Sequence, residues 1–349
     1  MNRILITILL IIFHFSLMSQ NKELKKLFSK GKYDQVIEKA QSRLQGNTVD
    51  PDLNSILGRA YTASKQFTIA IPYLEKSIAS ETISNEVKQI SKAYLAKCYF
   101  VKGEEQKAVK LLKECQNDRS SKEATNYSHK YLSLFQTEVY YKAWEVVETD
   151  YIRFHFQDKK KLENVGEFIA RNEINYKRIT EVLDVDPIKK VDIFVWSDRN
   201  EAFRKFNRPL AFSNSDLRIV NVLSNQANEY ELSHMLCQLA VQSKFKSMLI
   251  QEGLGLYFDQ MDKNLLKVAR LRVPKDKFSL LELWQEPTKY ERDLSYPVGA
   301  SFIEFLINKG GKKKLKEFLR IQTIKHAEEV YPDFHKWVKT FEAMLMMKM

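Results

Sequence analysis

A pattern of small residues that returns about every 34 positions is the feature that most restricts the fold of this chain. Val36, Ala70 and Ala108 occupy the same place in three copies of a short helical motif. Small side chains let two helices approach closely, while an aromatic residue at a fixed offset fills the next groove. The pattern therefore predicts stacked helical hairpins over residues 20–120.

Two of the units share further residues. The middle unit carries Gly58 and Tyr61, and the next unit carries Ala96 and Tyr99 at the corresponding places. This combination resembles the tetratricopeptide repeat, whose period is about 34 residues. The alternative is a set of generic helical hairpins of similar shape. The resemblance implies that a protein or peptide partner binds on the concave face of the array.

Residues 1–19 have the pattern of a secretory signal peptide. Arg3 provides the positive charge, residues 4–13 form an almost unbroken apolar run, and Ser19 is a small residue before a polar start. The run is shorter than the ~20 apolar residues of a membrane span. Cleavage after Ser19 would place the protein in the periplasm, at the cell surface or outside the cell, with no integral membrane segment. The alternative is an uncleaved N-terminal anchor.

Composition narrows the classes of function. Only 10 of the 349 residues are glycine, and neither of the common glycine-rich phosphate-binding patterns occurs. The formal net charge is +12, but Lys and Arg are spread along the chain without an arginine-rich arm or an aromatic RNA-binding motif. We therefore expect a helix-rich protein with a solvated basic surface and no nucleic-acid partner.

The chain contains three cysteines, at positions 98, 115 and 237. Cys98 and Cys115 either pair or stay as buried thiols, and we favour buried thiols that pack as small hydrophobic groups. No C-x-x-C pair occurs, which excludes a structural zinc site built on such a pair.

The pattern changes in the second half of the chain. A connecting helix is expected within residues 121–150, and alternation with β-branched and aromatic residues then predicts strands at 151–156, 191–196 and 217–222. A helix at 160–183 separates the first two strands, and almost everything after residue 228 is helical. The fold class is therefore mainly α, with helical repeats followed by an α+β domain at 151–349.

One stretch of this domain carries chemistry. Tyr230-Glu-Leu-Ser-His234 differs at one position from H-E-x-x-H, in which two His at i and i+4 bind zinc and the Glu activates the metal-bound water. Glu252, followed by Gly253, lies on the next predicted helix after His234. A carboxylate is a common third protein ligand of catalytic zinc.

These motifs, in the order strand, helix, strand, strand, metal helix and Glu-Gly helix, resemble the gluzincin metallopeptidases, in particular exported bacterial members with N-terminal repeats. The resemblance covers 151–349. It implies that Glu231 is the general base, that His234 and Glu252 are zinc ligands, and that Tyr230 occupies the place of the first His. Tyr296 is a candidate to stabilise the oxyanion, although packing beside Pro297 also explains it.

Tyr230 is the departure that decides the expected function. A phenol has a pKa of about 10 and must lose its proton to bind zinc, which leaves His234 and Glu252 as a poor site. We therefore expect a catalytically impaired protein that binds or scaffolds through its repeats and its cleft. The alternatives are an active zinc peptidase with a Tyr/His/Glu site, and a protein whose repeats carry the whole role.

Overall fold

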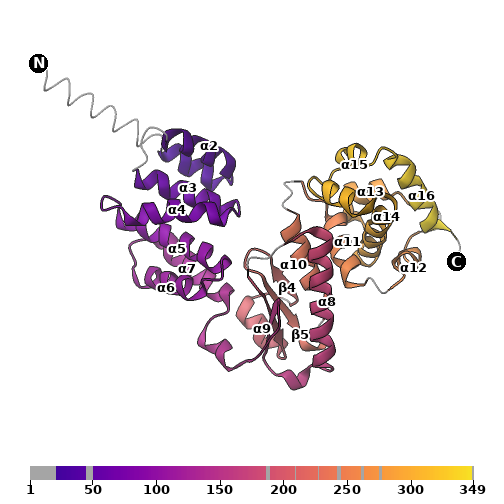
Figure 1. Cartoon of the computed structure of the whole chain (residues 1–349), viewed down its shortest axis with the longest axis horizontal. Coiled ribbons are helices and arrows are strands. Elements are labelled where there is room, and N and C mark those ends of the chain that lie inside the picture. The colour runs from indigo at the N-terminus through magenta and orange to yellow at the C-terminus, as the bar shows by residue number, and fades with distance from the viewer. Residues whose placement is uncertain are drawn as a thin grey trace, which may run out of the picture. The chain divides into compact units, whose positions relative to one another are not determined.

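The computed structural model describes residues 21–44, 50–185, 189–208, 210–226, 228–241, 245–260, 263–274 and 277–347. The predicted signal peptide at 1–19 lies outside the described residues. The chain divides into two compact units, of which the first ends at Lys142 and the second begins at Ala143. Helices dominate both units, and the described residues form one small mixed sheet, so the prediction of a mainly α protein is confirmed (Figure 1).

The first unit is a succession of helices joined by short turns. A helical segment at 21–29 is followed by α2 (Tyr33–Leu44), α3 (Pro51–Ala63), α4 (Phe67–Ala79), α5 (Asn85–Val101), α6 (Glu105–Asn117) and α7 (Lys122–Phe135). The side chains of Asp50, Ser84 and Ser121 accept hydrogen bonds from backbone N–H groups in the first turns of α3, α5 and α7. These bonds satisfy donors that a helix start otherwise leaves unpaired, so each of the three helices has a defined beginning.

Small residues decide how closely these helices pack. Helix α3 packs against both α4 and α5, and α5 packs against both α6 and α7. A Cβ atom added to Gly58 of α3 would lie 2.6 Å from Leu74 Cγ of α4, so only glycine fits there. Ala70 and Ala108, two of the repeated small residues, are fully buried. The helical hairpins expected from the pattern are present, and their tetratricopeptide assignment stays a prediction.

The three cysteines are buried free thiols. Cys98 Sγ lies 3.2 Å from Thr62 Oγ1, and Cys115 Sγ donates to the Gln89 carbonyl oxygen at 3.3 Å. Burial raises the pKa of the Cys98 and Cys115 thiols to about 11. The prediction of buried thiols is confirmed.

The expectation of one connecting helix within residues 121–150 is wrong. Helix α7 ends at Phe135, and the 3-10 helix η1 (Val139–Ala143) and the strand β1 (Glu145–Glu148) follow it. β1 pairs antiparallel with the strand that begins at Ile152. Because Val146 and Val147 are β-branched, an edge strand suits them better than the last turns of a helix.

The sheet formed by the described residues has the strand order β1-β2-β3-β5-β4. The strands after β1 are β2 (Ile152–Phe156), β3 (Val191–Trp196), β4 (Phe212–Asn214) and β5 (Ile219–Leu223). β2, β3 and β5 are parallel, and β1 and β4 are antiparallel edges. The three predicted strands form the parallel centre of the sheet. The sequence does not predict the two edges, because such short strands with no buried residue carry no apolar alternation.

Alternation along β2 separates the two faces of the sheet. Ile152, Phe154 and Phe156 are buried in the core of the second unit, where the Phe154 ring meets Phe168 of α8 (Val165–Leu183) edge to face at 5.7 Å. The residues between them belong to the opposite face, because successive side chains in a strand alternate. One face is therefore apolar and covered by helix, and the other carries charge.

The helical half follows the sheet, as the sequence predicts. Helix α9 (Arg199–Phe206) lies between β3 and β4. The helices after the sheet are α10 (Tyr230–Ala240), α11 (Met248–Asp259), α12 (Leu265–Arg270), α13 (Leu280–Gln285), α14 (Arg292–Leu319), α15 (Ile324–Val330) and α16 (Phe334–Met346). Short 3-10 turns are η2 (Lys159–Lys161), η3 (Ser224–Gln226) and η4 (Pro287–Lys289). None of the helices in the described part of the chain is both long and apolar enough to cross a membrane.

Two glycines let α11 and α14 touch backbone to backbone. A Cβ atom added to Gly253 of α11 would lie 2.4 Å from the carbonyl carbon of Gly299 in α14, and one added to Gly299 would lie 2.5 Å from the Leu249 carbonyl oxygen. Real Cβ atoms essentially never come so close. Farther along α14, Gly311 has a φ of 78°, which bends the helix in a conformation that glycine tolerates.

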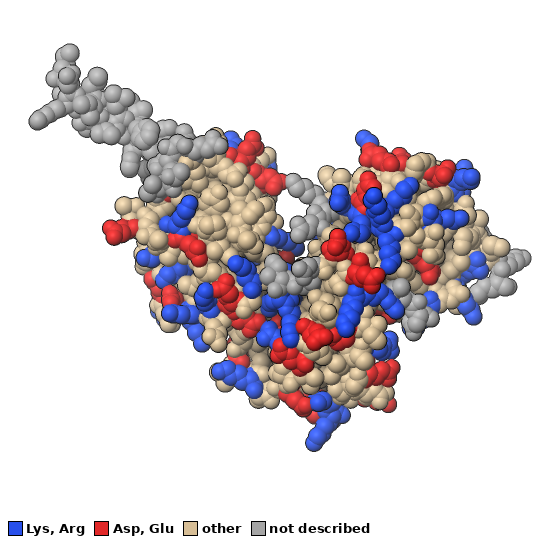
Figure 2. Space-filling view, viewed as in Figure 1, with Lys and Arg blue, Asp and Glu red and all other residues tan. Residues whose placement is uncertain are grey.

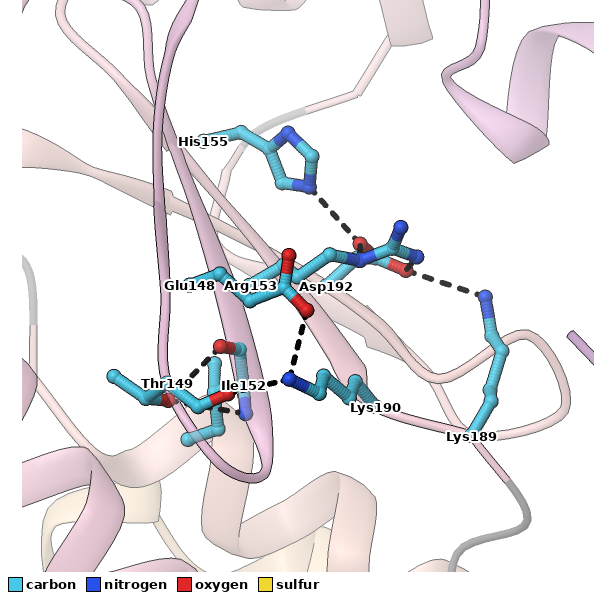
Figure 3. A network of polar contacts seen from close by, with 8 residues as sticks. All are labelled: Glu148, Thr149, Ile152, Arg153, His155, Lys189, Lys190 and Asp192. Atoms are coloured by element: carbon cyan, nitrogen blue, oxygen red, sulfur yellow. Dashed lines mark hydrogen bonds and ion pairs between the residues drawn. The ribbon is translucent and has the colours of Figure 1, made fainter.

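A buried ion cluster holds β2 and β3 together on the charged face of the sheet (Figure 3). Asp192 Oδ1 lies 2.9 Å from Arg153 Nε and 2.9 Å from His155 Nε2, and Asp192 Oδ2 lies 3.2 Å from Lys189 Nζ. Burial disfavours the charge on Asp192, but His155, Lys189 and Arg153 outweigh it and lower the pKa of this carboxyl to about 2. The cluster therefore keeps Asp192 ionised inside the fold.

Charged side chains of both signs are scattered over the face of the molecule seen in Figure 2. Lys and Arg are interspersed there with Asp and Glu and with uncharged residues on both units. The ion pairs of the chain include Lys316 with Asp184 at 3.0 Å and Lys190 with Glu148 at 2.7 Å. The positive surplus of the sequence is therefore dispersed among charges of both signs.

Gly253→Ala tests the backbone contact between α11 and α14. We expect it to lower the free energy of unfolding by about 3 kcal/mol, the upper end of the usual cost of overpacking a core. Gly166→Ala in α8 is the control, because nothing lies within 4 Å of its added Cβ, and it should leave stability unchanged or raise it by up to about 1 kcal/mol. Urea denaturation measures both variants, and equal stability of the two would contradict the packing argument.

Asp192→Asn tests the ion cluster through its pH dependence. The carboxyl pKa is lowered from 3.8 to about 2 in the folded chain, which corresponds to about 2 kcal/mol. This stability is present above pH 4 and is lost as the pH falls through 2. In urea denaturation we expect the wild type to lose about 2 kcal/mol more than Asp192→Asn between pH 6 and pH 2. The exposed Asp150→Asn should behave as the wild type, and parallel pH profiles for all three would contradict the assignment.

Candidate functional site

The first turn of α10 places two of the predicted site residues on one helical face. Tyr230 and His234 are four residues apart, and their rings lie nearly parallel, 5.9 Å between centroids and 6° between planes. Gly255 of α11 lies against this pair, since a Cβ atom added there would be 3.5 Å from both His234 Cα and Tyr230 Cε2. An added Cβ at this distance would make ordinary van der Waals contacts, so α11 packs against the two rings without requiring a glycine here.

Glu252 projects from α11 toward both rings. The Tyr230 hydroxyl donates a short hydrogen bond to Glu252 Oε2, and His234 Nε2 lies 3.8 Å from Glu252 Oε1. The structure thus brings together the three residues that the sequence predicts as the metal site. The His234 and Glu252 side chains are 19% and 20% exposed, so solvent still reaches the pair.

Tyr296 of α14 joins the same group. Its ring lies 6.5 Å from that of Tyr230 with 13° between the planes. Burial and then the charge of Glu252 raise the pKa of the Tyr296 phenol. Tyr296 therefore belongs to the site by position, beside Tyr230 and near Glu252.

The environment keeps Tyr230 protonated. Burial is the largest cause and the charge of Glu252 the next, and together they raise the pKa of Tyr230 far above its ordinary value. The hydrogen bond to Glu252 acts in the same direction, because it needs the phenolic proton. Tyr230 is thus a hydrogen-bond donor here, which is the reverse of what a metal ligand does.

His234 is held in its neutral form. Burial lowers its pKa, and the opposing attraction of Glu252 is smaller. Its Nε2 atom also lies 3.3 Å from the Gln238 side-chain nitrogen one turn later in α10. Since the ring is neutral, its approach to Glu252 is a polar contact and not an ion pair.

Glu231 makes its polar contacts with the edge of the sheet. Burial raises its pKa to about 7, and the charge of Glu252 adds to the shift, while a hydrogen bond with Ser213 of β4 and the charge of Arg208 oppose it. The Arg208 guanidinium lies over the ring of Phe212 at 3.3 Å. Sequence reasoning does not find Ser213 or Arg208, because only the pairing of β4 with β5 carries them to α10.

Buried polar contacts fix the start of α10. Ser233 receives a hydrogen bond from Asn175 of α8 at 2.6 Å. The N-cap residue Glu229 pairs with Arg171 of α8 at 3.0 Å. These contacts place the first turn of α10 relative to α8, so Tyr230 has little freedom to move away from Glu252.

The donor atoms fit a zinc ion poorly. A neutral His234 and a carboxylate suit zinc, but the third position holds a protonated phenol that occupies one oxygen of that carboxylate. Among the described residues, no three His, Cys, Asp or Glu side chains are grouped so that they could hold a metal. No step of a metal-dependent reaction follows from this arrangement.

Comparison with known proteins adds no family. No protein-family model matches the chain, and no curated protein sequence matches it.

Tyr230→Phe tests the contact at the centre of the site. Removing the hydroxyl takes one hydrogen bond from a partly buried carboxylate, and bonds to charged groups contribute about 2 kcal/mol. We expect the free energy of unfolding in urea to fall by that amount. Tyr151→Phe is the matched control, since that phenol is 37% exposed and stacks on Tyr176. A loss no larger than that of Tyr151→Phe would show that the Tyr230 hydroxyl adds nothing.

Proposed function

We propose that this protein is an exported, metallopeptidase-like binding protein in which a tyrosine hydroxyl, and not a metal ion, contacts the carboxylate of the site. The observation that carries the proposal is the hydrogen bond from Tyr230 to Glu252, beside a neutral His234. The phenol lies where the first zinc-binding His of the motif would be, and it satisfies the carboxylate that would otherwise bind the ion. The hydrogen bond between Tyr230 and Glu252 therefore does two things. It stabilises the packing of α10 against α11, and it occupies the carboxylate oxygen that a metal would need.

The arrangement of the second unit supports the gluzincin assignment. The order β2, α8, β3, β5, α10 and α11 is the order expected from the resemblance, and the residues of the degenerate motif meet at the junction of α10 and α11. The kink at Gly311 follows the long helix behind the site. On this proposal the protein keeps the fold of a metallopeptidase, but the residues of the former metal site now contact one another and hold no metal.

The first unit supplies the binding role. Its successive hairpins place the 21–29 segment, α3, α5 and α7 along one face, which suits an extended partner as in repeat proteins. The mixed charge seen in Figure 2 favours a protein or peptide over a nucleic acid, whose backbone needs a basic stripe. The predicted signal peptide would deliver this binding surface to the bacterial envelope or beyond.

A weakly active zinc peptidase is the second candidate, because Tyr230, His234 and Glu252 do converge. In that case zinc would bind as the phenol loses its proton, and Glu231 would act as the base. Chelator-sensitive peptide hydrolysis that Glu231→Gln abolishes would establish this function and remove the first.

Zinc content of the purified protein separates the two candidates. We expect fewer than about 0.1 zinc ions per chain after incubation with zinc and dialysis, because binding must displace a proton held by burial and by Glu252. Tyr230→His should raise the zinc content toward one ion per chain. The variant supplies a second neutral imidazole four residues before His234, on the same helical face.

The control for this experiment is the double variant Tyr230→His with His234→Ala, which should return the zinc content to the wild-type level. A wild-type content of one zinc per chain would overturn the binding-protein proposal. Metal analysis by mass spectrometry reads the content without any assay of activity.

A further inference from the structure

A cavity of about 490 Å³ opens on one face of the helical first unit. Four elements line it: the helical segment 21–29, α3, α5 and α7. The apolar part of its lining is made by the side chains of Leu24, Phe28, Ile56, Val87 and Ile90. Ligand pockets of proteins span ~300 to ~1,000 Å³, so the cavity is large enough for one or two side chains of a bound peptide.

Arg59 of α3 forms part of the lining, but its charge is already satisfied. Its guanidinium lies against the rings of both Phe28 and Tyr94, at 4.7 and 5.0 Å from their centroids. One of its nitrogens donates to Glu123 of α7 at 2.5 Å. Both rings and the carboxylate hold the group in place, so Arg59 is a structural part of the wall and is not offered to an incoming anion.

The rim of the cavity is acidic. Asp52, Glu86 and Glu123 all line it from exposed positions. Burial is the largest cause that raises the pKa of Asp52, the charge of Asp50 adds to the shift, and Lys25 opposes it. Within the described part of the chain, Glu86 forms no ion pair. An arriving cation would relieve the repulsion at Asp52 and give Glu86 a partner.

The lining holds two positive side chains, Lys25 and Arg59, and three negative ones. Arg59 neutralises Glu123, and Lys25 lies near Asp52. Glu86 then leaves one unbalanced negative charge among the lining residues, in a chain whose formal net charge is +12. The local sign is opposite to that of the protein as a whole, which selects for positively charged partners at short range.

We propose that this cavity binds a peptide segment in which one large apolar side chain is flanked by Lys or Arg. The apolar side chain would contact Phe28 and Val87, which are the partly exposed apolar residues of the lining, while the flanking cations meet Asp52 and Glu86 at the rim. The inference rests on the proposed binding function and names the chemistry of the partner. An acidic peptide would be repelled by the carboxylates of the rim. Arg59 would not offset this repulsion, because it is already paired with Glu123.

Binding of labelled peptides to the purified protein, followed by fluorescence anisotropy, tests the inference. The probe is a Gly/Ser peptide with one Leu between two Lys. One comparison peptide carries Glu in place of both Lys, and another carries Ser in place of Leu. We expect the probe to bind at least tenfold more tightly than either comparison peptide, and its affinity to fall as salt rises.

The double variant Asp52→Asn with Glu86→Gln should weaken binding of the probe roughly tenfold, because two exposed carboxylates together account for about one factor of ten. Both positions are exposed, so the fold should be unaffected. Glu38→Gln on α2 is the matched control, since Glu38 is exposed and does not line the cavity, and it should bind as the wild type does.

Equal affinity for the Lys and Glu peptides, tighter binding of the Glu peptide, or an equal effect of Glu38→Gln would overturn this inference. None of these outcomes depends on the zinc content of the second unit. Conversely, one zinc per chain would overturn the proposed function and leave the peptide preference standing, so the two failures are distinguishable.

Discussion

The hydrogen bond from Tyr230 to Glu252 is the contact on which the interpretation of the second unit depends. It requires α10 and α11 to lie close, and Gly255 of α11 lies against Tyr230 and His234. It also requires α14 to support α11, which the contact between Gly253 and Gly299 permits. Gly253, the residue after Glu252, therefore acts here as a spacer between α11 and α14. This packing brings a phenol, an imidazole and a carboxylate to one place.

The close packing of Tyr230, His234 and Glu252 also explains why Tyr230 keeps its proton and does not act as a metal ligand. Burial favours neutral forms, and it leaves Tyr230 protonated and His234 uncharged. Glu252 then accepts a hydrogen bond from the Tyr230 hydroxyl. A second imidazole in place of Tyr230 would present a nitrogen lone pair where the phenol presents a proton, and would leave the Glu252 oxygen available to an ion. The phenol thus makes this group a hydrogen-bonded cluster.

The sequence predicts the parts of the fold whose signal is local. Strands β2, β3 and β5 follow from alternation, α8 from helical spacing, and the hairpins of the first unit from the recurrence of Val36, Ala70 and Ala108. The edge strands β1 and β4 are not predicted, because their pairing partners and not their own residues hold them extended. For the same reason the sequence does not reveal the end of α7 at Phe135, after which the chain turns to pair with β2.

The candidate site divides in the same way. The spacing within Tyr230-Glu-Leu-Ser-His234 and the position of Glu252 are properties of the sequence, and they determine which side chains are available. The direction of the Tyr230 proton, the neutral state of His234 and the contact of Glu231 with Ser213 are decided by burial and by neighbours from other elements. The acidic mouth of the cavity in the first unit is likewise a tertiary feature, since Asp52, Glu86 and Glu123 come from three helices. Sequence spacing determines what lies on one helix, whereas protonation and charge patterns arise only where several elements meet.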